Sequence, residues 1–206
     1  FVKVTESNLD EKINELLELS GRHFQVDRTF FVHLTEHQQT YEWCNEGVES
    51  AIDMIPKLTR GTFPWWMNEM LNSDLVNVIY VEMLPPEARE EIEMFKSHQM
   101  KSLISITVRN KGNIMGILFF ASVKAVKSLG GNHQELLRIL ANLLTDALVK
   151  VEAEKEIGYM AYYDALTGFP NHALFKKQLE QAIHLARGTG NLIGVLFIDL
   201  DSFKSV

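Results

Sequence analysis

The pattern of hydrophobic positions near the start of the chain changes from a helical to an extended period. Apolar residues between Leu9 and Leu17 recur at intervals of three and four, which predicts an amphipathic helix that Ser20-Gly21 ends. Two runs rich in β-branched and aromatic residues follow at 29–34 and 40–45. Only a few polar residues separate these runs, so we predict a β-hairpin.

The region that follows mixes helical and extended patterns. We expect, in chain order, a helical region at 48–71 broken at Pro56 and Pro64, a strand at 76–80, a helix from Pro85 to Lys96, and strands at 102–108 and 114–123. Helices interleaved with neighbouring strands in this order predict an α+β fold. Its centre would be an antiparallel sheet with helices packed on it.

A long helix is predicted to begin at Asn132, where Asn132 and Glu135 form a capping-box pattern. Its apolar stripe continues to Val151 and then gives way to charged residues, which marks the end of packing against the sheet. We interpret 152–163 as a linker helix. A turn, a second amphipathic helix and an apolar strand at 192–198 are expected beyond it.

Composition limits the kinds of partner. Apolar residues make up 46% and charged residues 23% of the chain, and the formal net charge is -7. This balance favours a folded domain and gives no basic surface for nucleic acid or for an anionic membrane. The single cysteine, Cys44, fits a reducing cytosol, and no apolar run approaches the roughly 20 residues that span a bilayer. A cytoplasmic protein is expected.

Two acidic residues follow the apolar strand near the end of the chain. Asp199 and Asp201 share one face while the strand stays extended, and Lys204 adds a positive charge nearby. Mg²⁺ prefers carboxylate and phosphate oxygens, so this arrangement suits phosphoryl or nucleotidyl transfer. By itself, however, the Asp-x-Asp pattern is more typical of a solvated strand end.

The combination of this strand with the preceding turn and helix is far more specific. It resembles the opening of the GGDEF family of diguanylate cyclases, which has a turn, a helix and a strand ending in Asp-x-Asp-x-Phe-Lys. The residues that match are Asp164, Leu166, Thr167, Gly168, Asn171, Phe175, Asp199, Asp201, Phe203 and Lys204. Phe169 and His172 depart from the family, which usually has Leu and Arg there. Pro170 and the Ala-Leu-Phe that follows resemble members in which a phosphodiesterase (EAL) domain comes next.

The resemblance implies roles for five residues. Asp199 through its carboxylate and Leu200 through its carbonyl would bind Mg²⁺, and Ser202, Phe203 and Lys204 would lie along the phosphates of GTP. The family joins two GTP molecules into cyclic di-GMP where two domains meet. Its guanine-contacting Asn and its Gly-Gly-Asp/Glu-Glu-Phe signature, with a second metal ligand, are absent from this sequence. We therefore expect this chain to be inactive as a cyclase and to bind no Mg²⁺.

The N-terminal region resembles GAF domains, which are cytosolic ligand-binding or dimerisation modules. The resemblance is carried by five phrases in order, beginning at Tyr41, Phe63, Leu84, Lys101 and Gly116. Five aromatic residues are candidates for lining a sensor pocket: Trp43, Phe63, Trp65, Trp66 and Tyr80. The alternative that these residues are ordinary core stays open. Cys44 does not fit the bilin-binding pattern and is interpreted as a packing or surface residue.

These observations predict three parts: a GAF-like sensor domain at 5–151, a linker helix at 152–163, and the N-terminal part of a GGDEF domain at 164–206. The expected function is sensory control of a diguanylate cyclase by an unknown small ligand or by homodimerisation. Two alternatives remain. One is a non-catalytic, GTP-binding regulator of a downstream EAL phosphodiesterase, and the other is a plain dimerisation module.

Overall fold

The computed structural model describes residues 4–34, 38–52 and 61–198 of the chain. The chain divides into two compact units, residues 1–152 and residues 153–206. Each unit is described by itself below.

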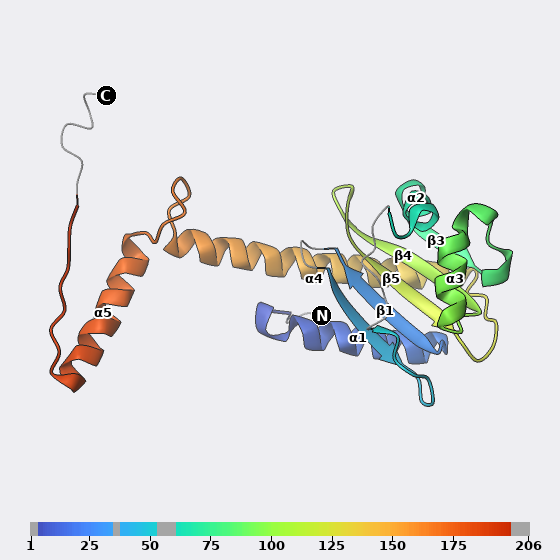
Figure 1. Ribbon diagram of the computed structural model, residues 1–206, viewed down its shortest axis with the longest axis horizontal. Helices are drawn as coiled ribbons and strands as arrows, with labels where there is room; N and C mark the ends of the chain where they lie inside the picture. The colour runs from blue at the N-terminus through green and yellow to red at the C-terminus, as the bar shows by residue number, and fades with distance from the viewer. Residues whose placement is uncertain (1–3, 35–37, 53–60, 199–206) are drawn as a thin grey trace, which may run out of the picture. The chain divides into compact units, whose positions relative to one another are not determined.

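A five-stranded antiparallel sheet forms the centre of the first unit (Figure 1). Its strands are β1 (Arg28–His33), β2 (Gln39–Cys44), β3 (Leu75–Val78), β4 (Ser102–Asn110) and β5 (Asn113–Ser122), arranged in the order β2-β1-β5-β4-β3. Every neighbouring pair is antiparallel. The predicted hairpin and the predicted α+β class are confirmed.

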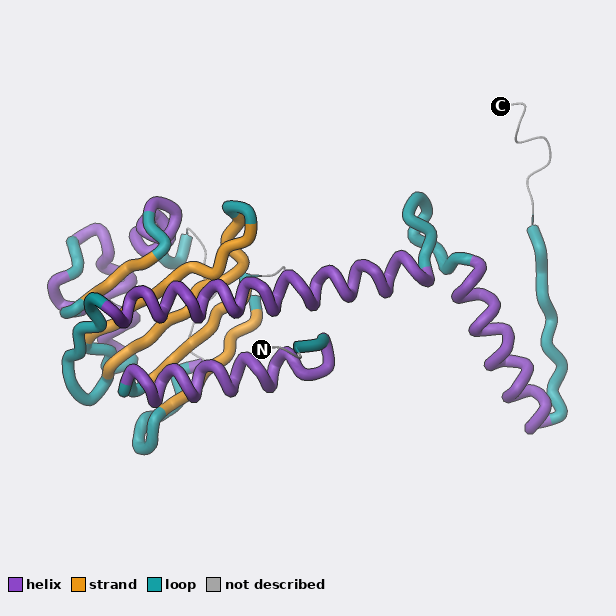
Figure 2. The backbone as a smooth tube through the Cα atoms, turned by 180° about the vertical axis from the view of Figure 1, so that it is seen from behind, coloured by secondary structure: helices purple, strands orange, loops and turns teal. Residues whose placement is uncertain are grey.

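Helices cover both faces of the sheet. α1 (Leu9–Phe24) and α4 (Asn132–Tyr162) lie on one face, and α2 (Pro64–Asn72) and α3 (Arg89–Ser97) lie on the other (Figures 1 and 2). Side chains alternate between these two layers along each strand, so Phe31 packs with α1 and α4 while Phe30 packs on the α2 side. Short 3-10 helices lie at Glu6–Asn8, just before α1, and at Val81–Met83 and Pro86–Ala88, between β3 and α3.

The first helix is longer than its sequence predicts. Ser20 and Gly21 do not end α1 but are buried inside it, and the helix ends at Phe24 with Gln25 in the left-handed conformation. Gly21 lies against the ring of Trp43, and this close packing explains the glycine. The glycine thus allows close packing on the sheet and does not mark a helix end. The prediction that the helix ends at Ser20-Gly21 was wrong.

The region between β2 and α2 also differs from its sequence pattern. Residues 48–51 form no helix. The Glu42 carboxylate holds the end of this segment in place by accepting hydrogen bonds from the amide of Ala51. Helical structure in the described residues of this region is largely confined to α2, which begins at Pro64. Pro56 lies outside the described residues. Proline at the first position of α2 is consistent with a helix start, because that position needs no amide donor.

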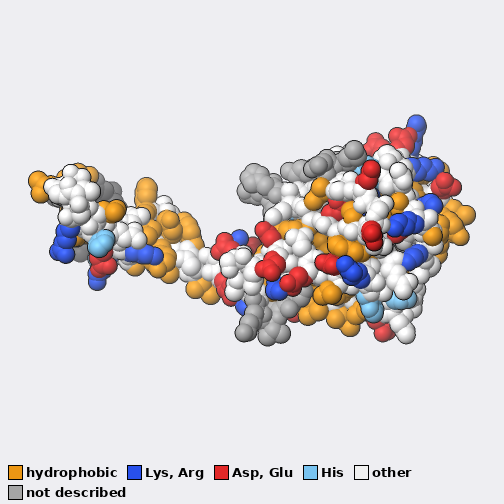
Figure 3. All heavy atoms as spheres, turned by 90° about the horizontal axis from the view of Figure 1, so that it is seen from below, with side chains coloured by type: hydrophobic (Ala, Val, Ile, Leu, Met, Phe, Trp, Pro, Cys, Tyr) orange, Lys and Arg blue, Asp and Glu red, His pale blue; other side chains and the backbone are white. Residues whose placement is uncertain are grey.

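The second unit contains the last part of α4, a turn, and α5 (His172–Thr189). Residues 191–198 are extended chain without regular structure, so the predicted strand at 192–198 is not present. Leu192 is 99% and Leu196 83% exposed. A strand needs a neighbour to satisfy its backbone hydrogen bonds, and no described strand lies beside this segment. Many hydrophobic side chains of this unit are exposed, and several groups of them are visible on the face in Figure 3.

Among the described residues, no helix is both long and apolar enough to cross a lipid bilayer.

Candidate functional site

The start of α2 is held by a carboxylate from α3. Glu91 is fully buried, and its Oε1 accepts hydrogen bonds from the backbone amides of Trp65 at 3.0 Å and Trp66 at 3.1 Å. The first amides of a helix have no partner within the helix, and a carboxylate there also meets the positive end of the helix dipole. Glu91 thus fixes α2 to α3 and sets the position of Trp66.

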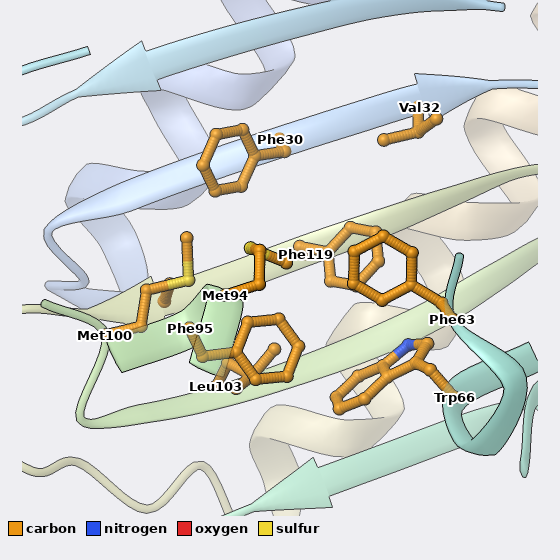
Figure 4. Close-up of a pocket in the computed structure, with 10 residues that line it drawn as sticks. Phe30, Val32, Phe63, Trp66, Met94, Phe95, Met100, Leu103 and Phe119 are labelled. Carbon is orange, nitrogen blue, oxygen red and sulfur yellow. The ribbon is translucent and has the colours of Figure 1, made fainter. Parts of the chain in front are cut away.

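An apolar cavity of about 30 Å³ lies between these helices and the sheet (Figure 4). The ten described residues that line it all have predominantly apolar side chains. They come from α2, α3, β1, β4, β5 and the loops beside them, and include Phe30, Phe63, Trp66, Phe95, Met100 and Phe119. The cavity is therefore built by elements that are far apart in the sequence.

Trp66 is the largest of these residues and is 1% exposed. Its ring meets Phe95 edge-on at 5.2 Å and lies tilted against Phe119 at 5.9 Å. The indole Nε1 is buried and finds no hydrogen-bond partner among the described residues. Figure 4 shows this nitrogen on the edge of the ring that faces Phe63, another wall of the cavity.

The five aromatic residues named from the sequence lie in three places. Phe63 and Trp66 line the cavity. Trp65 and Tyr80 line an open surface groove beside β3. Trp43 lies on the opposite face of the sheet, where its ring packs against Gly21 of α1 and lines a separate surface pocket. The structure thus brings two of the five together at one cavity.

Sequence reasoning did not identify Phe30, Met94, Phe95, Met100 or Phe119 as cavity residues. Phe30 and Phe119 are opposite each other on β1 and β5, where alternation along each strand directs them to the α2 side. That alternation was visible in the sequence. The pairing of β1 with β5 was not, and it is this pairing that brings the two phenylalanines together.

A buried ion pair lies next to the cavity. Arg28 Nε is 3.3 Å from Glu42 Oε1, and both side chains are 4% exposed. The Arg28 guanidinium lies 5.7 Å from the centre of the Phe30 ring and donates hydrogen bonds to the carbonyls of Glu49 and His98. It therefore ties the loop after β2 and the end of α3 to the sheet.

Cys44 on β2 pairs with Arg28 on β1 and so lies beside this ion pair. Burial, together with the nearby Glu42 carboxylate, raises the pKa of the Cys44 thiol. A raised pKa keeps the sulfur protonated and weakly nucleophilic at neutral pH. Cys44 is half-buried, and its expected role as a packing or surface residue stays a prediction.

In the second unit, the matched motif residues form a compact turn between α4 and α5. Asp164 Oδ1 accepts hydrogen bonds from the amides of Leu166 and Thr167, at 3.2 and 2.9 Å, and from the Thr167 hydroxyl at 2.8 Å. The bonds from Thr167 are the main reason that the pKa of Asp164 is lowered. Gly168 follows with a φ of 70°, which favours glycine.

Asn171 completes the turn at both of its ends. Its Oδ1 accepts from the amides of Ala173 and Leu174 and so caps α5, while its side-chain nitrogen donates to the carbonyl of Ala161 in α4. Asn is among the best residues for capping a helix start. The Asp-x-x-Thr-Gly and Asn positions of the motif thus each have a structural reason.

The residues expected to bind metal and phosphate, Asp199, Leu200, Ser202, Phe203 and Lys204, lie outside the described residues. Within the described ranges, no group of three or more His, Cys, Asp or Glu side chains is placed to hold a metal ion.

Comparisons with known proteins identify the family that the end of the chain resembles. Residues 161–206 match the family model "Diguanylate cyclase, GGDEF domain". A bifunctional diguanylate cyclase/cyclic di-GMP phosphodiesterase, MucR of Pseudomonas aeruginosa, is 32% identical over 93 residues, which are 45% of this chain and 13% of MucR. The diguanylate cyclase TpbB of the same organism is 34% identical over 70 residues, or 32% of this chain and 16% of TpbB. The chain therefore spans less than a fifth of either relative.

The first unit is similar to solved GAF domains. The third GAF domain of Slr1393 from Synechocystis, in its photoproduct state, superposes with a TM-score of 0.58 at 15% identity, over 72% of this chain and 98% of that domain. At this level of identity the similarity shows the fold alone. The chain therefore combines a domain with the GAF fold and a C-terminal segment, residues 161–206, that matches the GGDEF family.

Proposed function

We propose that this chain is the sensory and linker region of a cyclic-di-GMP signalling protein, in which the GAF-fold domain controls a diguanylate cyclase domain. The match of residues 161–206 to the GGDEF family carries this proposal. The parts proposed are a sensor at 5–151, a linker helix at 152–163, and cyclase sequence from 164 onward. The boundary between the compact units at Glu152 and Ala153 supports this division.

The proposed cyclase uses GTP and Mg²⁺. Asp199 and Leu200 supply metal ligands, and Ser202, Phe203 and Lys204 lie along the phosphates. The turn supports this assignment, because Asp164, Thr167, Gly168 and Asn171 have the family's residue types and make the hydrogen bonds that those types allow.

Regulation through a homodimer is part of the proposal, since two cyclase domains must meet for two GTP molecules to be joined. α4 has two apolar stripes. Leu144 and Leu148 belong to the stripe that packs on the sheet, while Ile139 and Leu143 are one turn apart and are 53% and 41% exposed. The exposed pair suits packing against a second copy of the same helix. Light scattering tests this, and Leu143→Glu should weaken self-association.

The decisive experiment places residues 1–206 in the protein that contains the rest of the GGDEF domain. Conversion of GTP to cyclic di-GMP should require Mg²⁺, and Asp199→Asn should lower the rate at least about a hundredfold, because a metal ligand to the phosphates is lost. Glu180→Gln, which removes an exposed carboxylate on α5, is the matched control and should leave the rate unchanged. Failure of the wild-type protein either to bind or to convert GTP would refute the proposal.

A second candidate is a non-catalytic regulator of a downstream phosphodiesterase. The similarity to MucR, whose name includes cyclic di-GMP phosphodiesterase, favours keeping it. The same assay separates the two functions. Binding of GTP with no cyclic di-GMP formed, together with a change in phosphodiesterase rate on adding GTP, would select the regulator.

A further inference from the structure

A surface pocket lies beside Trp43, where α1 leads into β1. Its volume is about 400 Å³, and it is lined by the end of α1, the end of β2 and the loop after β5. The half-buried ring of Trp43, which packs against Gly21, forms one wall. The pocket therefore has room for a molecule of one or two rings and offers it an aromatic surface.

Basic side chains gather at this pocket although the chain as a whole carries a net charge of -7. Arg22, Lys124 and Lys127 are among the residues that line it. Arg22 pairs with Glu18 at 2.8 Å, whereas the two lysines form no ion pair with a carboxylate in the described part of the chain. Two positive charges at the pocket thus lack a carboxylate partner there.

The acidic residue among those that line the pocket is Asp27, which is 6% exposed. Its Oδ2 accepts hydrogen bonds from the backbone amides of Val123 at 2.8 Å and Lys124 at 2.9 Å. The carboxylate therefore holds the loop after β5 next to the start of β1, and these two amides already engage it. The pocket keeps an excess of positive charge.

Backbone carbonyls hold both lysine side chains in place. Lys124 Nζ donates to the carbonyl of Glu46 at 2.7 Å, and Lys127 Nζ donates to the carbonyl of Gln25. A lysine ammonium has three N–H donors, so each of these groups keeps two for a ligand. Because the carbonyls already restrict these flexible chains, less conformational entropy is lost when an anion binds.

We propose that this pocket binds a small aromatic anion, whose ring lies on Trp43 and whose carboxylate or phosphate group is held by Lys124 and Lys127. Hydrogen bonds from an ammonium to an anion are about twice as strong as those between neutral groups. A cationic ligand would be repelled by the same two lysines. The inference goes beyond the proposed function, because residues of the first unit alone carry it.

Four probes test the proposal on the full chain: phenyl phosphate, inorganic phosphate, phenol, and benzylamine, which is a cation at neutral pH. Binding is followed by NMR, using the backbone amides of Lys124 and Lys127 and the indole N–H of Trp43, which Trp43→Leu identifies among the three tryptophans. Phenyl phosphate should shift these signals. Inorganic phosphate lacks the ring and phenol lacks the charge, so each should bind at least about tenfold more weakly. Benzylamine should not bind.

Substitutions separate the two halves of the site. Lys124→Gln and Lys127→Gln each remove one positive charge and should weaken the binding of phenyl phosphate about fivefold or more. Lys111→Gln, at an exposed position between β4 and β5, is the matched control and should leave binding unchanged. Trp43→Leu should lower the affinity for phenyl phosphate to that for inorganic phosphate. If Trp43→Leu does not fold, the four probes on the wild-type chain and the lysine variants still decide.

Three results would each overturn the proposal. They are binding of any other probe as tight as that of phenyl phosphate, binding of phenyl phosphate that neither lysine substitution weakens, and no binding of phenyl phosphate by the folded chain. The experiment uses neither GTP nor Mg²⁺, so its failure would leave the cyclic-di-GMP role standing. A failed cyclase assay would likewise leave the aromatic-anion site standing.

Discussion

Gly21 on α1 lies directly against the ring of Trp43 on β2, and a Cβ atom built on Gly21 would come within 2.3 Å of Trp43 Cζ3. The distance is far below a normal contact, so the helix can approach the sheet at this point only because the residue has no side chain. The packing of α1 on β2 therefore depends on this pair.

Gly21→Ala should destabilise the first unit despite the better helix propensity of alanine. We expect the free energy of unfolding to fall by about 1–3 kcal/mol, the usual range for overpacking. Denaturant unfolding followed by tryptophan fluorescence measures it. Gly158→Ala is the matched control, because Gly158 is also helical and a Cβ there meets nothing within 4 Å. Restoration of stability by Trp43→Leu in the Gly21→Ala background would identify the ring as the cause.

The Glu91 carboxylate should stabilise the first unit through the hydrogen bonds that it accepts from two backbone amides of α2. Glu91→Ala leaves the part-buried amide of Trp65 and the buried amide of Trp66 without their acceptor, so we expect a loss of about 1–3 kcal/mol in the free energy of unfolding. Thermal unfolding by circular dichroism measures this loss. Glu90→Ala, at the exposed neighbouring position, should change it by less than about 0.5 kcal/mol. Equal effects of the two substitutions would show that the cap is unimportant.

The Arg28–Glu42 pair should behave as a buried unit. Arg28→Met leaves the Glu42 carboxylate buried without its cation and should cost about 3–5 kcal/mol of stability. Replacing both residues, as in Arg28→Met with Glu42→Leu, should recover a large part of this loss. The control is Arg89→Met, which breaks the ion pair between Arg89 and Glu93. These two side chains are 83% and 67% exposed, so the substitution should cost at most about 1 kcal/mol of stability. Denaturant unfolding of the four proteins tests the difference, and a double variant less stable than Arg28→Met would contradict it.

Tyr41 should make the stability of the first unit depend on alkaline pH. Burial, and then the 2.6 Å hydrogen bond that its hydroxyl donates to Asp10, raise the pKa of Tyr41 well above its usual value of 10.0. The folded protein therefore keeps this proton when the unfolded chain has lost it. The contribution is fully present below pH 10 and is lost as the pH rises above it towards the folded pKa.

The measurement is the free energy of unfolding at several pH values between 8 and 11.5, for the wild-type protein and for Tyr41→Phe. The variant should be less stable at pH 8, by about 1 kcal/mol for the lost hydrogen bond. The difference between the two proteins should shrink above pH 10. A constant difference across the range would show that Tyr41 ionises normally in the folded state.

Most of the elements of the first unit are predictable from its sequence because their patterns are local. The β4–β5 hairpin is an example, since Lys111 and Gly112 occupy a two-residue turn with φ values of 49° and 87°. Such a turn suits glycine, and the sequence Asn-Lys-Gly-Asn indicated it. The predicted helix from Pro85 was found as the 3-10 helix Pro86–Ala88 followed by α3.

The cavity was less predictable because it forms between helices and strands that are far apart in the sequence. Nothing local distinguishes Trp66, which lines the cavity, from Trp65, which faces the groove beside β3, because consecutive residues of one helix differ only in direction. That Trp43 lies on the opposite face of the sheet from this cavity was unpredictable for a similar reason, since its strand could present either face to either layer. The predicted strand at 192–198 has the right composition, but no described strand is available to pair with it.

The strand order has a consequence for how the protein is made. β1 pairs with β5 along its whole length, yet nearly eighty residues separate the end of one from the start of the other. On the ribosome, the first hairpin must therefore wait with one edge open until the β4–β5 hairpin has emerged. Contacts between such distant segments slow folding, so the chain's exposure to aggregation should be greatest during the synthesis of this intervening stretch.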